Sequence, residues 1–237
     1  MADTIRERII AAVAAKLTEI RTAYGYATEC GSTVLLGSMD VASSLLPAID
    51  VFPRVESSSR EYGKQVCTMP VDVKALALLG TTNPSTLGEQ LLGEVITCLL
   101  GIEYTRTFTS GGAYQILPGH TITGATSHAT GRVIAVTLTT GSWAAGTAAG
   151  TIRFRSKTGI FQAENLDIGS YVNVATIAGD ATTIQAKDIT GGGLVDDISY
   201  AGGGVENYPQ TKDDALVVTA TFTVTYQTNI GNPYSQT

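Results

Sequence analysis

The strongest constraint on the fold is a long alternation of side chains near the C-terminus. Apolar residues occupy every second position from Leu216 to Tyr226, with Thr, Val or Gln between and after them. Successive side chains of a strand point to opposite faces, so the pattern predicts one strand of roughly 40 Å at about 3.3 Å per residue. A slip of one residue would turn the apolar face outward, so the register of this strand should be tightly held.

This strand needs a partner, and no hairpin partner directly precedes it. Residues 66–76 also alternate between apolar and polar side chains, and residues 102–108 form a further extended segment. We expect the C-terminal strand to pair with one of these two segments. Proline has no NH to donate to a ladder, so we expect an edge or a bulge at Pro70.

Two segments carry helical signals. Thr4-Ile5-Arg6-Glu7 has the form of a capping box, and apolar residues then recur in steps of three or four up to Ile20. Asn83-Pro84 provides a cap residue followed by proline at the first helical position, and Gly101 closes the leucine-rich stretch that follows. Between these helices, residues 55–64 are polar and indicate an exposed loop.

The middle of the chain differs from both ends in composition and in periodicity. Seventeen of the 26 glycines lie between residues 107 and 206, where no helical periodicity is visible. Short extended runs alternate with turns, at 131–140, 151–157, 171–177 and 182–189. This pattern is typical of a small all-β module with glycine-rich exits.

These elements predict a discontinuous domain with an insertion. We assign residues 1–108 and 207–237 to the parent domain and residues 109–206 to an inserted Gly/Thr-rich all-β module. The expected fold class is α+β: a mostly antiparallel sheet backed by two helices, with an inserted small all-β domain.

Composition narrows the function classes. The chain has 237 residues, of which 43% are hydrophobic and 15% charged, with a formal net charge of -6. This balance argues against disorder and against a basic nucleic-acid-binding face. The three cysteines form no CxxC pair and are expected to be buried free thiols, as in a reducing compartment. No apolar run reaches the length of a membrane span, and we expect synthesis in a cytoplasm.

No catalytic constellation is recognisable. His120 and His128 have no Cys or carboxylate at ligand spacing, and no nucleophile, P-loop or dinucleotide motif occurs. The glycine runs at 191–193 and 202–204 are interpreted as linkers, and the acidic pairs at 196–197 and 213–214 as solvated acids. The sequence therefore predicts no catalytic residue, no cofactor and no metal, and a protein that is not an enzyme.

One basic stripe is a possible contact surface. Arg153, Arg155 and Lys157 alternate along a predicted strand and share a face. They fit either a contact for an acidic partner or the solvated outer face of a small sheet, and the absence of interleaved aromatics favours the second interpretation.

The order of elements resembles the tail terminator proteins of long-tailed bacteriophages, also called tail-completion or minor tail proteins. The resemblance covers about 1–108 and 207–237, and its most specific part is the closing strand followed by Asn232-Pro233-Tyr234. The matching segments, in chain order, are the first helix from Asp3, the extended segment Ile49–Pro53, the strand Val66–Ala75, the helix Leu87–Leu100 and the strand Phe222–Thr228. Within the insertion, Gly119–Gly131 is similar to a Gly-Ala-Thr-Ser-x-Ala-Thr-Gly β-element of phage virion proteins, which tends to decorate the particle exterior.

The resemblance implies a structural virion protein of the tail or neck, assembled in the host cytoplasm. It implies a homohexameric ring that caps the tail tube, stops tube polymerisation and joins the tail to the head connector or neck protein. DNA would pass through the lumen without sequence-specific binding, and no membrane is involved. Candidate interface residues are Arg60, Glu61, Tyr62, Tyr226, Pro233 and Tyr234.

Two alternatives stay open. The chain could be another neck or head-completion protein, or a tail tube protein. Alternatively, the inserted module could bind a host-surface glycan through its few aromatic residues, which are Tyr114, Trp143, Phe154, Phe161 and Tyr171.

Overall fold

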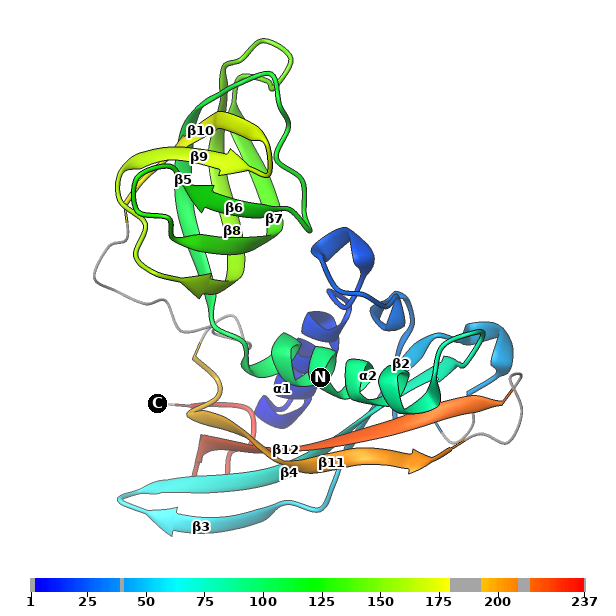
Figure 1. Ribbon diagram of the computed structural model, residues 1–237. Helices are drawn as coiled ribbons and strands as arrows, with labels where there is room; N and C mark the ends of the chain where they lie inside the picture. Colours follow the sequence, from blue (N-terminus) through cyan, green and yellow to red (C-terminus); the bar gives the residue numbers. More distant parts are fainter. Residues whose placement is uncertain (1–2, 39–40, 180–192, 209–213, 237) are drawn as a thin grey trace. The chain divides into compact units, whose positions relative to one another are not determined.

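The computed structural model describes residues 3–38, 41–179, 193–208 and 214–236. The chain divides into two units. Unit 1 comprises residues 1–21, 27–100 and 188–237, and unit 2 comprises residues 22–26 and 101–187. Each unit has its own sheet (Figure 1).

Unit 1 is built on a six-stranded sheet in the order β1-β2-β4-β12-β11, with β3 also paired to β4. All of its pairings are antiparallel except that of β1 with β2. Its strands are β1 (Val34–Leu36), β2 (Ala48–Pro53), β3 (Ser57–Glu61), β4 (Lys64–Leu78), β11 (Asp197–Asn207) and β12 (Ala215–Asn229).

The centre of this sheet is the pair β4 and β12. The two strands run antiparallel in unbroken register from Ala215 opposite Leu78 to Asn229 opposite Lys64. Every second side chain of β12 is buried, from Leu216 to Thr228. Of the two partners expected for the C-terminal strand, residues 66–76 are confirmed, whereas residues 102–108 belong to a strand that pairs elsewhere. A slip of one residue in this register would turn the apolar face outward.

Pro70 lies where β4 changes partner along one side. Residues 64–68 of β4 pair with β3, and residues 71–76 pair with β2. The missing NH of Pro70 thus falls in the gap between two partner strands, and its carbonyl oxygen accepts from the NH of Arg54 at 2.8 Å. A proline is tolerated in a central strand here because no ladder bond is lost.

The two α-helices of the described chain both belong to unit 1. Helix α1 (Ile5–Leu17) begins at the capping box of Thr4 and Glu7, as the sequence predicts. Helix α2 (Pro84–Leu100) follows Asn83, whose side chain accepts from the NH of Ser85 at 2.9 Å. Gly88 lets α2 approach β11, since a Cβ at this position would stand 2.5 Å from Val205.

Unit 2 is a closed six-stranded barrel in the order β10-β5-β8-β7-β6-β9. Its interior holds a separate core that includes Phe108, Ile152 and Phe154. The strands are β5 (Glu103–Gly111), β6 (Thr121–Gly124), β7 (Thr130–Thr140), β8 (Ala148–Thr158), β9 (Glu164–Ile168) and β10 (Tyr171–Ile177).

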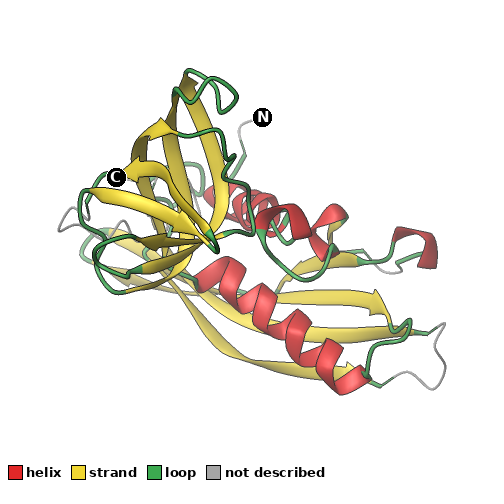
Figure 2. Ribbon diagram, turned by 45° about the horizontal axis from the view of Figure 1, so that its top comes forward, coloured by secondary structure: helices red, strands yellow, loops and turns green. Residues whose placement is uncertain are grey.

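The expected α+β class is wrong. Strands contain 48% of the residues and helices 18%, in two sheets, so the protein is mostly β (Figure 2). The Gly/Thr-rich segment closes into a full barrel with its own core instead of a small appendage. Residues 55–64, expected to be a loop, contain β3 and the turn of a hairpin with β4, because cross-strand pairing there outweighs the low strand propensity of serine.

The strands at the two ends of the insertion differ from the sequence interpretation. Strand β5 pairs within the barrel, although residues up to 108 had been assigned to the parent domain. Strand β11 pairs with β12 in unit 1, although residues up to 206 had been assigned to the module. The glycine run 202–204 suggested a linker but lies inside β11. The predicted strand at 182–189, the glycines at 191–192 and Asp213 lie outside the described residues.

Candidate functional site

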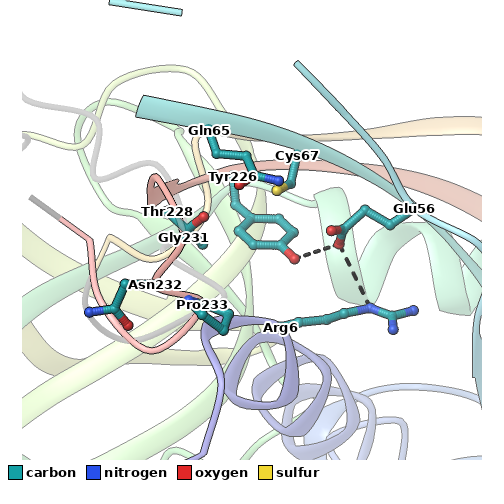
Figure 3. Close-up of a pocket in the computed structure, with 9 residues that line it drawn as sticks. All are labelled: Arg6, Glu56, Gln65, Cys67, Tyr226, Thr228, Gly231, Asn232 and Pro233. Carbon is teal, nitrogen blue, oxygen red and sulfur yellow. Dashed lines mark hydrogen bonds and ion pairs between the residues drawn. The ribbon is translucent and has the colours of Figure 1, made fainter. Parts of the chain in front are cut away.

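A pocket of about 190 Å³ lies at one end of the sheet of unit 1 (Figure 3). It is bounded by α1, the segment before β3, the strands β4 and β12, and the C-terminal turn. Its lining residues are Arg6, Glu56, Gln65, Cys67, Tyr226, Thr228, Gly231, Asn232 and Pro233.

A charged pair and a tyrosine form the polar centre of the pocket. The hydroxyl of Tyr226 donates to Oε2 of Glu56 at 2.5 Å, and Nε of Arg6 lies 3.8 Å from the same oxygen (Figure 3). Burial raises the pKa of Tyr226, and the carboxylate of Glu56 raises it further because it would repel a phenolate. Tyr226 is therefore a neutral hydrogen-bond donor.

Arg6 is held in place from several directions. Its Nη2 donates to the carbonyl oxygen of Arg54 at 2.8 Å, and its Nε lies 3.2 Å from the sulfur of Met69. Its position in the first turn of α1 follows from the capping box, which sets where the helix begins. Cys67 borders the same site, and burial followed by the charge of Glu56 raises the pKa of its thiol. The thiol is thus poorly suited to act as a nucleophile.

The C-terminal turn closes the pocket. The NH of Ile5, in the first turn of α1, donates to the carbonyl oxygen of Pro233 at 2.8 Å. Asn229 binds Ser235 through both main chain and side chain. The segment after β12 therefore folds back on unit 1.

The tip of the β3–β4 hairpin is a second candidate functional site, in addition to the pocket. Glu61 pairs with Lys64, and the two residues between them, Tyr62 and Gly63, both have positive φ, at 46° and 85°. This is the backbone of a two-residue hairpin turn, which favours Asn or Gly at the first position. Tyr62 instead places a ring there with a relative exposure of 106%. A fully exposed aromatic residue in a strained conformation is unusual for a purely structural turn.

The structure thus divides the predicted interface residues into three places. Tyr226 and Pro233 line the pocket, and Tyr226 is only 2% exposed, so its role is to position Glu56. Arg60, Glu61 and Tyr62 lie at the exposed hairpin tip, and Tyr234 is half-exposed in the C-terminal turn. Sequence reasoning missed Arg6 and Glu56, because only the fold brings them beside Tyr226.

The basic stripe of β8 has a different role from the one expected. Arg155 is 5% exposed, its guanidinium lies 3.6 Å from the ring centroid of Tyr26, and it donates to the carbonyl oxygen of Gly25 at 3.2 Å. Lys157 lies over the ring of Tyr104, and Arg153 pairs with Glu103 at 3.5 Å. The interpretation as a solvated outer face is therefore wrong for Arg155, which holds a segment distant in sequence.

The Gly-Ala-Thr-Ser motif is built around a buried carboxylate. Glu164 accepts from the NH groups of Thr126 and Ser127, from the Ser127 hydroxyl, and from the NH of Gln162. Burial alone would raise the pKa of Glu164, but these hydrogen bonds outweigh it and lower the pKa to about 2. The motif therefore has a structural role in closing a turn of the barrel.

Within the described part of the chain, the remaining candidates are not brought together into a chemical site. Among residues 3–38, 41–179, 193–208 and 214–236, no group of three or more His, Cys, Asp or Glu is placed to hold a metal ion. Nδ1 of His120 accepts from the NH of Leu117 at 3.2 Å, and its ring stacks on Tyr114. All three cysteines are free and buried, as predicted. None of the described helices combines the length and apolar character needed to cross a bilayer.

Comparison with protein-family models finds no match, and comparison with the curated proteins finds none either.

Proposed function

We propose that this chain is a structural virion protein of a long-tailed bacteriophage that forms a ring at the end of the tail tube. The ring stops tube polymerisation and joins the tail to the connector or neck protein of the head. Following the resemblance of the sequence, the ring contains six copies and lets DNA pass without reading its sequence. The chain performs no catalytic step in this role, and it resides in the tail or neck of the virion.

The observation that carries this proposal is the pairing of β12 with β4 along their full length. The resemblance requires that the closing strand, with its Tyr226 and the following Asn232-Pro233-Tyr234, belong to the same sheet as the N-terminal strands. The N-terminal helix joins the same unit through the bond between Ile5 and Pro233. The matched segments at both ends of the chain therefore form one folded unit, as a capping subunit needs.

The hairpin tip supports a contact with another protein. Exposed aromatic residues are frequent anchors of protein interfaces. The side chain of Tyr62 is fully exposed in its own chain, and those of Arg60 and Glu61 beside it are exposed as well. We assign this tip to the contact with the tube or with the neighbouring subunit.

Electron microscopy of the purified chain tests the proposal. Discrete short rings are the expected result. Long open tubes would instead identify a tube protein. A chain that stays monomeric at all accessible concentrations would contradict the proposed ring.

One observation favours glycan binding by the barrel as a second function. Tyr171 is 54% exposed and stacks on Tyr114 with a centroid distance of 3.9 Å. The other three aromatic candidates, Trp143, Phe154 and Phe161, are buried in the barrel core and offer no ring to a sugar. A glycan array with the full chain tests this function. Binding that is lost in Tyr171→Ala but kept in Tyr200→Ala would support it.

A further inference from the structure

Among the described residues, the sheet of unit 1 ends on β11 at one side and on β1 and the shorter-reaching β3 at the other, since β3 pairs only with β4. The strand registers place β1 and β11 at the same level along the strand direction. Leu35 lies opposite Asp50, which lies opposite Lys74, then Thr219, then Gly204. The two outermost strands therefore present edges at matching levels.

The two edge strands also run in opposite directions. Strands β2, β4, β12 and β11 alternate in direction, and β1 runs parallel to β2. If a second copy is set beside the first in the same orientation, β11 of one copy meets β1 of the other in antiparallel fashion. No inversion of either copy is needed.

Among the described strands, each edge strand pairs on one side only, β1 with β2 and β11 with β12. On β1, the carbonyl oxygen of Thr33 and the NH of Gly37 both bind β2. Because the peptide groups of successive residues in a strand point to alternate sides, those of Val34 and Leu36 point away from β2. On β11, a Cβ added at Gly202 or Gly204 would meet no atom within 4 Å. A strand without side chains at these positions permits close approach of another backbone.

Exposed apolar side chains accompany these edges. Leu36 on β1 is 57% exposed, and Tyr200 on β11 is 37% exposed. Register shifts flank the glycine run, between Tyr200 and Gly202 and between Val205 and Asn207. The regular stretch between the shifts is the part that lies level with β1.

Several charges near the two edges are paired within the chain. Glu206 on β11 pairs with Lys74 at 3.0 Å, and Arg54 pairs with Asp72 at 2.6 Å. Asp196 and Asp197 are exposed at one side of the sheet, and both Arg60 and Glu61 are exposed at the other. The pairing of the edges therefore rests on the direction and level of the two strands and not on charge.

We infer that β11 of one copy of this chain pairs antiparallel with β1 of the next copy, so that the sheet continues across the subunit boundary. The two edges are different surfaces, so the contact is head-to-tail and produces a ring when the rotation between copies closes. This inference deepens the proposed function by naming the surfaces through which the ring assembles.

Cysteine cross-linking of the full chain tests the pairing. Leu35→Cys and Gly204→Cys are the matched pair, because residues directly opposite on antiparallel strands lie within disulfide range. The double variant, oxidised and run without reductant, should lose its monomer band to a ladder of covalent oligomers. A mixture of the two single variants should give a covalent dimer, whereas neither single variant alone should cross-link.

A control double variant and the single variant Leu35→Cys complete the cross-linking test. The double variant Leu35→Cys/Ser58→Cys has the same number of new thiols, but Ser58 lies on the same side of the sheet as β1, so it should stay monomeric on the gel. A covalent dimer from Leu35→Cys alone would show a symmetric contact and overturn the inference. A double variant without a ladder, in a sample that is oligomeric in solution, would also overturn it.

A charge introduced on the edge strand β1 provides a second test of the pairing, with the oligomeric state as its measurement. Leu36→Lys should shift the chain to monomer in analytical ultracentrifugation, while Ile160→Lys, at a 71% exposed position in unit 2, should leave the oligomer unchanged. An oligomer that survives Leu36→Lys contradicts the inference. Rings without the cross-link would overturn this pairing but keep the proposed function. A cross-link within open filaments would keep the pairing and overturn the proposed function.

Discussion

The hydroxyl of Tyr226 donates a hydrogen bond to the carboxylate of Glu56, and thereby joins the last strand of the sheet to the segment that precedes β3. The two residues are separated by 170 positions in sequence. Arg6 approaches the same carboxylate, so the N-terminal helix, the hairpin and the C-terminal strand meet at one acidic side chain. This group fixes the base of the hairpin whose tip we assign to a partner.

Replacing Tyr226 with Phe should lower the free energy of unfolding by about 2 kcal/mol, because a buried hydrogen bond to a charged acceptor is lost while the ring remains. Urea unfolding measures the change. Tyr234→Phe, at a half-exposed ring, is the matched control and should lie within about 0.5 kcal/mol of the parent chain. Equal effects of the two changes would contradict a special role for the bond to Glu56.

Glu164 should make the barrel sensitive to acid. Its folded pKa of about 2 lies below the ordinary glutamate pKa of 4.5, so its contribution to stability is complete above pH 4.5 and is lost as the pH falls toward 2. The shift corresponds to about 3 kcal/mol at neutral pH. Glu164→Gln should be destabilised by a similar amount at pH 7, and its difference from the parent chain should shrink toward pH 3 in thermal melts. Glu89→Gln, at an exposed position of α2, is the matched control and should lie within about 0.5 kcal/mol of the parent chain at pH 7.

Arg155 and Tyr26 should be energetically coupled. The guanidinium is buried over the ring, and a desolvated contact of this kind contributes about 2 kcal/mol. A double-mutant cycle with Arg155→Leu and Tyr26→Leu, followed by urea unfolding, measures the coupling. Additive effects of the two substitutions would mean that Tyr26 is held by other contacts, such as the bond from Arg132 to Gly25.

Tyr62→Asn separates folding from assembly. Asparagine suits a positive φ better than tyrosine, so the variant should be as stable as the parent chain or more stable by about 0.5 kcal/mol. Assembly should weaken if the exposed ring is an interface anchor, as sedimentation and electron microscopy would reveal. A marked loss of stability would show that Tyr62 supports its own subunit instead.

Periodicity and caps in the sequence were sufficient to predict several elements. The capping box of Thr4 and Glu7 located the start of α1, and Asn83-Pro84 located the start of α2. The alternation from Leu216 to Tyr226 predicted β12 and which of its faces is buried. These features depend on residues within a few positions of one another, so the local sequence contains all the information they need.

Only the tertiary structure decided the balance of the fold and the composition of the site. It closed the strands between Glu103 and Ile177 into a barrel, buried Arg155 against Tyr26, and placed the glycine run 202–204 inside an edge strand. It also brought Arg6 and Glu56 to Tyr226. Each of these outcomes depends on pairing between segments far apart in the chain. Glycine, serine and a lone arginine carry weak local preferences, so their partners, and not their neighbours in sequence, determined where they lie.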